Sequence, residues 1–459
     1  MKKISLWLFG AIGIYFLASL WLFNRVYSTT KLVVDEEFHL RQGLHYCHGN
    51  FSVWDPKITT FPGLYILSTL ILMPLHLCET YFLRMVSLLA SILNIYWMYE
   101  IRKSILPAKE WKKSPSWGLA LDALSVSLLP PMYFFAFLYY TDIASISATL
   151  AMFNYSLKNS HKLAATAGSV AVLMRQTNIV WVGFILGLNV LDKLVAKAPR
   201  KKSKKDQKFA YSIHDIFNAV RYYLKKLSSG NIKWFLVIIE QFLPYLVVLV
   251  AFLVFLYING SIVIGDKSAH EATIHLAQIG YFSAFVAFFS SGFVLTQFKE
   301  IDQILLKRRY ILLLLGIFFL LAVEFNSVVH PYLLADNRHY TFYLWNRILA
   351  KPLMKYFAIP VFMFGAAWVL EMLEGQSAGF KLGYLVCTAV SVALQSMIEV
   401  RYFLIPYLIL RLTHTKSFKL NGLAVEFAFN IAINAATFYI FFTKTFFWSN
   451  YTEPQRIMW

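Results

Sequence analysis

The sequence predicts an all-α protein that crosses a membrane many times. Hydrophobic residues make up 58% of the 459 residues and charged residues only 15%, and the mean hydropathy is +0.56. This composition is too apolar for a soluble globular protein. Apolar runs of about twenty residues, the length that spans a bilayer core, recur along the chain. Since no polar interval between them is long enough for a soluble domain, we expect a single transmembrane domain over 1–459.

Membrane topology accounts for the positive charge of the chain. The net charge is +19, a value that in a soluble protein would indicate nucleic-acid binding. Here the basic residues lie in short loops between apolar runs, which is the distribution that keeps such loops in the cytosol. We therefore expect membrane lipid, and no nucleic acid, as a partner. The three cysteines are too few for a disulfide framework.

The first apolar run covers residues 4–23 and follows Met1, Lys2 and Lys3. A charged start and an apolar run are also typical of a signal peptide. This run, however, is about twenty residues long and lacks a small-residue cleavage site before Arg25. We interpret it as a retained transmembrane helix with a cytosolic N-terminus.

The second apolar run, residues 61–77, either crosses the membrane or lies along it. If it crossed, the basic segments near 102–113 and 193–233 would both be luminal, against the charge rule. If it lies along the membrane, both segments are cytosolic. Pro62 and Pro74, near its ends, also fit a short juxtamembrane helix. We favour this second interpretation, which makes 24–81 a luminal loop.

Twelve further spans complete the predicted bundle, so that about thirteen helices cross and the C-terminus is luminal. Segment 193–233 is lysine-rich and is expected to be a basic, solvated cytosolic linker. Segment 330–352 is expected to be a luminal loop. The twelve spans are predicted at 82–101, 118–138, 143–158, 162–174, 179–192, 236–258, 281–298, 310–329, 353–373, 380–398, 402–413 and 420–442.

The loop over 24–81 carries the densest group of carboxylates in the chain. Asp35, Glu36 and Glu37 directly follow two valines. Adjacent carboxylates at a helix exit either cap the helix at the interface or provide a general base beside a group that orients the substrate. We assign Asp35 and Glu36 to the catalytic group. Asp55 is a candidate substrate-binding residue, but before a proline it is equally typical of a turn.

The sequence does not indicate a metal or a nucleotide. The histidines and the cysteine of the same loop match no regular zinc spacing, and the chain has neither a D-x-D sequence nor a Gly-rich nucleotide loop. We therefore expect no metal and no cofactor. An activated donor must be held in another way, and in a membrane protein a lipid tail can hold it.

Other polar groups are expected on the same side of the membrane. Arg338 and His339 provide two donors on one loop, and an arginine fork suits a phosphate; salt bridges from Arg338 to Asp336 or Glu399 are the structural alternative. Asp142, Arg175 and Arg401 lie in further polar clusters between spans. We include these three with Arg338, His339 and Asp55 as candidate residues for the donor phosphate or the substrate.

Several long motifs together resemble one family. They are VVDEEFHLRQGLHYCHGNFSVWDPKITTFPGLY, FLYYTDIAS, LMRQTNIVW, HPYLLADNRHYTFYLWNR, MIEVRYFLIPY and the terminal EPQRIMW. The chain resembles, from end to end, the dolichyl-phosphoglucose-dependent α-1,2-glucosyltransferases of the endoplasmic reticulum membrane. These enzymes add the last glucose to the dolichyl-diphosphate-linked oligosaccharide precursor of N-glycosylation.

The resemblance implies a fold and a mechanism. The family belongs to the GT-C class of glycosyltransferases, in which an acidic residue at the start of the first luminal loop is the expected base. This position corresponds to Asp35, and Glu36 is the alternative residue with which the role could be shared. Dolichyl-phosphate glucose is the implied donor, and a β-linked donor with an α-linked product implies inversion. Arg338, His339 and Arg401 are the candidates to stabilise the leaving phosphate.

A transporter or channel is the alternative function. Transporters usually contain internal repeats and broken helices near the membrane midplane. The sequence contains no evident repeat, and its polar clusters lie at helix ends. Asp122, Glu240 and Glu324 fall within or near spans, where carboxylates with local partners explain them equally well.

Cys47 and Cys78 flank the run at 61–77. If that run lies along the luminal surface, both cysteines are in an oxidising compartment. They then either form a disulfide that holds the juxtamembrane helix or remain two free thiols.

Overall fold

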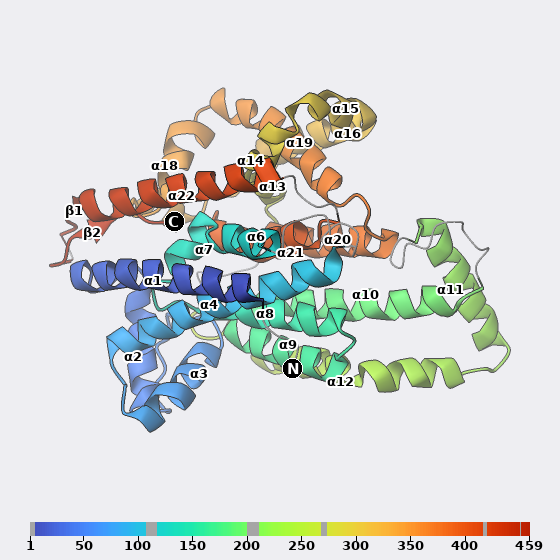
Figure 1. Cartoon of the computed structure of the whole chain (residues 1–459), viewed down its shortest axis with the longest axis horizontal. Helices are drawn as coiled ribbons and strands as arrows, with labels where there is room; N and C mark the ends of the chain where they lie inside the picture. Colours follow the sequence, from blue (N-terminus) through green and yellow to red (C-terminus); the bar gives the residue numbers. More distant parts are fainter. Residues whose placement is uncertain (1–4, 107–116, 200–210, 268–272, 416–419, 450) are drawn as a thin grey trace.

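The protein is almost entirely helical, and its longest helices run side by side (Figure 1). The computed structural model describes residues 5–106, 117–199, 211–267, 273–415, 420–449 and 451–459. The first part of the chain forms α1 (Leu6–Thr29), α2 (Glu36–Cys47), α3 (Gly63–Leu72), η1 (Met73–Leu75), α4 (Thr80–Ile105), α6 (Gly118–Ser127), α7 (Pro130–Phe135), α8 (Thr141–Leu157), α9 (His161–Met174), η2 (Gln176–Asn178) and α10 (Ile179–Lys197).

The second part continues the bundle and ends in a small hairpin. It forms α11 (Ile213–Ser228), α12 (Lys233–Asn259), α13 (Ala277–Phe289), α14 (Ser291–Thr296), η3 (Phe298–Glu300), α15 (Ile301–Lys307), α16 (Arg309–Phe325), α17 (Pro331–Ala335), α18 (Tyr340–Leu344), η4 (Trp345–Leu349), α19 (Met354–Met372), α20 (Ala378–Ala393), η5 (Val400–Phe403), α21 (Leu404–Thr413), α22 (Leu420–Thr443), β1 (Thr445–Phe446) and β2 (Gln455–Arg456). The strands pair antiparallel, with Thr445 opposite Arg456.

The chain is a multi-pass membrane protein. In the described ranges, six helical segments are long and apolar enough to cross a bilayer: α1, α4, η2 with α10, α12, α19 and α22. The other expected spans coincide with shorter helices. One of these, α8, is buried on nearly every side between α4, α9 and α10. Because a helix inside a bundle does not face lipid, serine, threonine and asparagine are tolerated along it.

Two expected spans are each divided into two helices. The span at 118–138 is interrupted at Leu129, where Pro130 and Pro131 follow and provide no N–H group to continue α6. The span at 281–298 is interrupted at Ser290, which lies between α13 and α14.

Part of segment 193–233, which was expected to be a solvated linker, is helical. Helix α10 continues to Lys197, and α11 begins with a capping box. The Ser212 hydroxyl accepts from the N–H of Asp215 (3.3 Å), and the Asp215 carboxylate accepts from the N–H of Ser212 (2.8 Å). Helix α11 connects the ends of α10 and α12 at the opposite end of the molecule from α2 and α3 (Figure 1).

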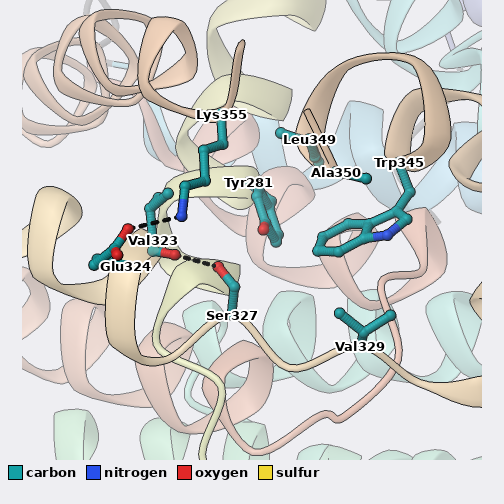
Figure 2. Close-up of a pocket in the computed structure, with 9 residues that line it drawn as sticks. All are labelled: Tyr281, Val323, Glu324, Ser327, Val329, Trp345, Leu349, Ala350 and Lys355. Atoms are coloured by element: carbon teal, nitrogen blue, oxygen red, sulfur yellow. Dashed lines mark hydrogen bonds and ion pairs between the residues drawn. The ribbon is translucent and has the colours of Figure 1, made fainter. Parts of the chain in front are cut away.

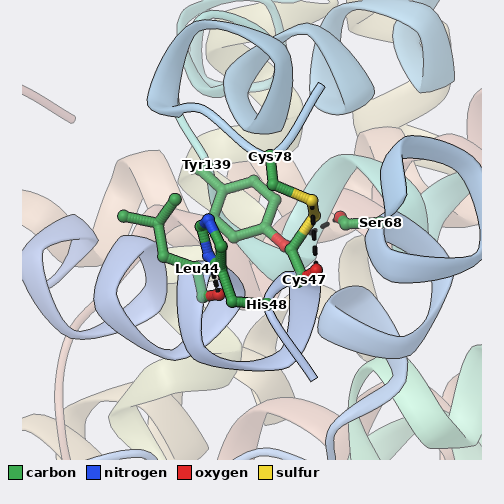
Figure 3. Close-up of a disulfide and its surroundings, with 6 residues drawn as sticks. All are labelled: Leu44, Cys47, His48, Ser68, Cys78 and Tyr139. Carbon is green, nitrogen blue, oxygen red and sulfur yellow. Dashed lines mark hydrogen bonds between the residues drawn. A yellow bond between two sulfur atoms is a disulfide. The ribbon is translucent and has the colours of Figure 1, made fainter. Parts of the chain in front are cut away.

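A disulfide fastens α2 to the start of α4. Cys47 is the last residue of α2, and its sulfur bonds to that of Cys78, with 5.6 Å between the two Cα atoms. The disulfide interpretation is therefore confirmed over two free thiols (Figure 3). The helical segment between the cysteines, Gly63–Leu75, is shorter than a membrane span and packs against α2. These features support a juxtamembrane helix.

Candidate active site

Asp35 stands at a strained point of the backbone. The preceding residue, Val34, has a φ of +51°, a conformation that a β-branched residue rarely adopts. Such strain costs about 1–3 kcal/mol and persists only where the surroundings impose it, most often at functional sites. Here the imposing contacts are on Val33 and Glu36, whose backbone groups both bond to the Tyr140 hydroxyl. The Asp35 side chain is left exposed at the start of α2.

Glu36 points the opposite way, into the protein. Its side chain is fully buried and forms a two-point ion pair with Arg84 of α4 (2.8 and 2.7 Å). One of its oxygens also accepts from the N–H of Tyr139 (2.7 Å). Arg84 in turn donates to the carbonyls of Thr30 and Lys31. Both carboxylate oxygens of Glu36 are therefore engaged in fixing the loop, which favours Asp35 over Glu36 as the candidate base.

The start of α8 brings three predicted residues together. Asp142 lies in the first turn of α8, where the helix dipole favours a carboxylate. It forms ion pairs with Arg175, which follows α9, and with Arg401 of η5 (3.3 Å). Burial opposes ionisation of Asp142, but the two guanidinium groups outweigh it and lower its pKa. Three sequence segments separated by up to 259 positions thus meet in one cluster.

Arg401 is held from several directions. Its Nε and Nη2 atoms contact Glu399, and its guanidinium lies 5.1 Å from the ring centres of both Phe135 and Tyr140. Arg175 is less enclosed: it contacts Asp142 through Nη1, lies 5.7 Å from the ring of Tyr402, and keeps 18% of its side chain accessible. Arg175 is therefore better placed to offer further donors to a ligand.

Electrostatics connect Asp35 to this cluster. Burial raises the pKa of Tyr140 well above its ordinary value, and the negative charge of Asp35 raises it further. The charge of Asp35 also contributes, after Glu399, Asp142 and Tyr140, to raising the pKa of Arg401. Tyr140 also links the two groups in space, because its hydroxyl bonds to the backbone of Val33 and Glu36 and its ring lies 5.1 Å from the guanidinium of Arg401.

His39 lies in the same site, one turn after Asp35 on α2. Its Nδ1 atom is 2.6 Å from the Tyr65 hydroxyl, and its ring lies 5.3 Å from that of Tyr140. His39 is partly buried as a residue, and burial and then the positive charge of Arg401 lower its pKa to about 4. His39 is thus neutral at pH 7. With Tyr65 as the donor, Nε2 carries the ring proton.

A small cavity opens beside the ion pairs. It is lined by Asp142, Arg175, Arg401 and Tyr402, with Gln395 and other residues of α8, α20 and α21, and has a volume of about 30 Å³. This volume suffices for a water molecule. A ligand larger than a water molecule would fit only if side chains moved.

Arg338 and His339 lie in a different cluster, at the C-terminal tail. Arg338 forms an ion pair with Asp336 (2.7 Å), donates to Gln455 (3.1 Å), and lies 4.3 Å from the ring of Trp448. The N–H of Met458 donates to the carbonyl of Arg338 (2.7 Å), and the N–H of Tyr340 donates to the carbonyl of Met458 (3.0 Å). The His339 ring contacts the carbonyl of Trp459. Of the two roles predicted for Arg338, the salt bridge to Asp336 is confirmed, and its donors are used within the protein.

Asp55 also has a structural role. Its Oδ1 atom accepts from the N–H of Lys57 (2.9 Å), and its own N–H donates to Gln42 (2.9 Å). These contacts fit the turn that was weighed as the alternative to a substrate contact.

Sequence reasoning missed several residues of the site. His39 was considered only as a metal ligand, and Tyr65, Tyr140 and Arg84 were not singled out as site residues. His39, Tyr65 and Tyr140 lie in motifs that the sequence analysis quotes, but the contacts of these residues and of Arg84 join segments that are far apart in the chain. In the described residues, no group of three or more His, Cys, Asp and Glu side chains is arranged to hold a metal ion.

Comparison with known proteins assigns the chain to a family. The model of the DIE2/ALG10 family matches residues 29–412. The chain belongs to the DIE2/ALG10 family. No solved structure matches it.

Relatives from distant organisms match this family member along almost its whole length. Proteins named Dol-P-Glc:Glc(2)Man(9)GlcNAc(2)-PP-Dol alpha-1,2-glucosyltransferase are 40% identical in Drosophila melanogaster, 36% in Rattus norvegicus and 34% in Homo sapiens. The first alignment covers 97% of both chains, and the other two cover 98% of both.

Proposed function

We propose that this chain is a dolichyl-phosphoglucose-dependent α-1,2-glucosyltransferase. The donor is dolichyl-phosphate glucose, and the acceptor is the dolichyl-diphosphate-linked oligosaccharide that already carries two glucoses. The names of the full-length relatives support this activity and not the transporter alternative. The observation that carries the proposal is an accessible carboxylate, Asp35, whose flanking backbone is held by the Tyr140 hydroxyl, while the Tyr140 ring lies 5.1 Å from the guanidinium of Arg401 in a buried ion-pair cluster.

The proposed reaction is a single displacement with inversion. Asp35 takes the proton from the 2-hydroxyl of the terminal glucose as that oxygen attacks the anomeric carbon of the donor. The new C–O bond forms as the bond from the anomeric carbon to the phosphate oxygen breaks. The electron pair of that bond leaves on dolichyl phosphate. Neutral His39, four residues after Asp35, offers Nε2–H to a substrate oxygen.

The leaving phosphate requires charge stabilisation rather than a proton. Arg175 and Arg401 are the proposed groups, with Asp142 and Glu399 fixing their orientation. Arg175 carries the larger share because its side chain is more accessible than that of Arg401. The contacts of Arg338 and His339 give them a supporting role at the tail.

We place the enzyme in the endoplasmic reticulum membrane with its active site in the lumen. In this proposal the bundle is of the GT-C type, with about thirteen crossings. The loop over 24–81 and the loop over 330–352 are luminal, and segment 193–233, including α11, is cytosolic. The basic residues of that segment support its side.

The direct test is a transfer assay with purified protein, synthetic dolichyl-phosphate glucose and a diglucosylated lipid-linked acceptor. The expected product carries a third glucose in an α-1,2 linkage, identified by linkage analysis. Glucose accumulation inside sealed vesicles without an acceptor would instead indicate transport. No transfer by folded wild-type protein would reject the proposal.

A further inference from the structure

A second cavity lies outside the ion-pair cluster and is not used by the proposed reaction. It has a volume of about 240 Å³ and is lined by residues of α13, α16, η4 and α19. Figure 2 shows the ion pair of Glu324 and Lys355 on one side, the Trp345 indole on the other, and Tyr281 between them. Ligand pockets for drug-sized molecules span about 300–1,000 Å³, so this cavity suits one small ring.

The cavity is linked to the small cavity beside Arg401 through Gln278 and Gln395. The amide of Gln278, in the first turn of α13, donates to the carbonyls of Gln395 (3.2 Å) and Met397 (2.8 Å). Gln395 lines the small cavity beside Arg401, and Tyr281, one turn after Gln278, lines the large one. Three residues of helix rise by about 4.5 Å. The linings of the two cavities are therefore connected by one turn of α13 and one hydrogen bond.

The charges of the cavity argue against an anionic ligand. The Lys355 ammonium is 2.7 Å from the Glu324 carboxylate, which also accepts from the Tyr356 hydroxyl (2.6 Å). A phosphate near Lys355 would meet the negative charge of Glu324. A polyprenyl chain fits no better, because it would remove water from an ion pair that is partly exposed, with 26% and 40% of the two side chains accessible.

The chemistry of the cavity matches a neutral sugar. A pyranose presents hydroxyl groups around its edge and C–H groups on its faces. Glu324 provides a charged acceptor for hydroxyl groups, and Lys355 provides a charged donor. Hydrogen bonds with one charged partner are stronger than those between neutral groups. The rings of Trp345 and Tyr281 provide electron-rich faces for C–H groups.

We infer that this cavity is a glycan subsite that binds a neutral hexose of the acceptor, outside the sugar that receives glucose. This inference rests on the proposed function, because it takes the acceptor to be a branched oligosaccharide. The subsite holds a second point of that oligosaccharide while its terminal glucose meets Asp35. It adds affinity for the acceptor and none for the donor.

The test is a binding measurement with full-length protein in detergent and three probes. These are the lipid-free diglucosylated mannose-rich oligosaccharide, a glucose disaccharide that represents only the reacting end, and a short-chain prenyl phosphate. The variants are Glu324→Gln and Trp345→Leu. Glu100→Gln is the matched control, because Glu100 pairs with Lys158 at the same distance of 2.7 Å outside the cavity.

Glu324→Gln should weaken binding of the oligosaccharide by roughly tenfold, which is the effect of losing one charge-assisted hydrogen bond. Trp345→Leu should also weaken it, because the aromatic ring is lost. Binding of the disaccharide and of the prenyl phosphate should stay the same, and the control should match wild type for all three. Trp345 is only 7% exposed, so if Trp345→Leu does not fold, Glu324→Gln alone decides.

Equal oligosaccharide affinity in Glu324→Gln and wild type would overturn the subsite, as would a selective loss of prenyl phosphate binding. The transfer assay on the same preparations separates this result from the proposed function. Transfer by wild type with unchanged oligosaccharide affinity in the variants rejects only the subsite. No transfer, together with lost oligosaccharide affinity in Glu324→Gln, rejects the transferase and supports the glycan site.

Discussion

Asp35 and Glu36 are neighbours with the same chemistry and opposite surroundings. Glu36 is fully buried, and Arg84 neutralises its charge. Asp35 is exposed beside the strained Val34 and acts electrostatically on Tyr140 and Arg401. A general base must reach the proton that it removes, and only the accessible carboxylate meets that requirement.

Asp35→Asn should therefore remove activity without removing the fold. The amide keeps the shape of the carboxylate but cannot accept a proton, so kcat should fall by roughly 10²–10⁴-fold. The unfolding temperature should stay close to that of wild type, because the side chain is exposed. Initial rates and thermal unfolding in detergent measure both quantities. Near wild-type turnover would assign the base to another group.

Glu36→Gln should have the opposite effect. Removing one charge from a buried ion pair leaves Arg84 uncompensated, at a cost of roughly 3–5 kcal/mol. We expect a clear loss of thermal stability. The double variant Glu36→Gln/Arg84→Met should be more stable than Glu36→Gln alone, since no buried charge remains. If Glu36→Gln unfolds like wild type but lacks activity, Glu36 acts in catalysis after all.

His39 should make stability depend on pH in a defined window. Its folded pKa of about 4 lies below the ordinary value of 6.5, so between these values the unfolded chain binds more protons. The contribution of neutral His39 to the free energy of unfolding is thus complete above pH 6.5 and is lost as the pH falls toward 4. Thermal unfolding from pH 7.5 to 4.5 should show a smaller decline for His39→Gln than for wild type. The exposed His48→Gln should decline like wild type.

At the scale of elements, the C-terminal tail connects three parts of the fold. Arg456 donates to the carbonyl of Thr29 at the end of α1 (2.9 Å), and Glu453 pairs with Lys31 (2.7 Å). Met458 pairs with the backbone around Arg338. Arg84 also donates to the carbonyls of Thr30 and Lys31. The tail and Arg84 therefore hold the same segment, which leads to Asp35.

Arg338→Lys should accordingly reduce stability rather than donor affinity. A lysine cannot make the forked contact with Asp336 while also reaching Gln455. The unfolding temperature should fall, and the KM for dolichyl-phosphate glucose should stay near wild type. Arg347→Lys, at an arginine whose guanidinium lies 5.5 Å from the centre of the Tyr343 ring, is the matched control. A large rise in donor KM with unchanged stability would return Arg338 to the phosphate site.

The sequence predicts elements better than it predicts the contacts between them. Every expected span has a helix, because apolar runs indicate burial, either in lipid or inside the bundle. The break at Pro130 and the capping box of Ser212 and Asp215 are also local signals, although they were not used. By contrast, the partnership of Glu36 with Arg84 spans 48 positions, and adjacent acidic residues do not reveal which one turns inward. Tertiary packing decides that.

At the scale of the whole molecule, the two ends of the bundle differ in chemistry. One end carries α2, α3 and the disulfide, and the other carries α11 (Figure 1). Helix α11 places Arg221, Lys225 and Lys226 beside an exposed apolar row that includes Phe217 and Leu224. This combination is typical of a helix at the surface of a membrane, and the basic charge favours the cytosolic face.

The two ends should therefore lie on opposite sides of the membrane, with Asn50 in the lumen. Asn50, Phe51 and Ser52 form an acceptor sequence for N-glycosylation, and Asn50 is exposed after α2. A second such sequence starts at Asn450, which lies outside the described residues. Expression in microsomes should give a mass increase that a glycosidase removes and that Asn50→Gln reduces.

A protease-sensitive tag inserted after Gly230, between α11 and α12, should be cut in intact microsomes. Protection of that tag would contradict the proposed orientation. A second tag can be placed before α3. Cleavage of this second tag in intact microsomes, together with an unmodified Asn50, would place Asp35 in the cytosol.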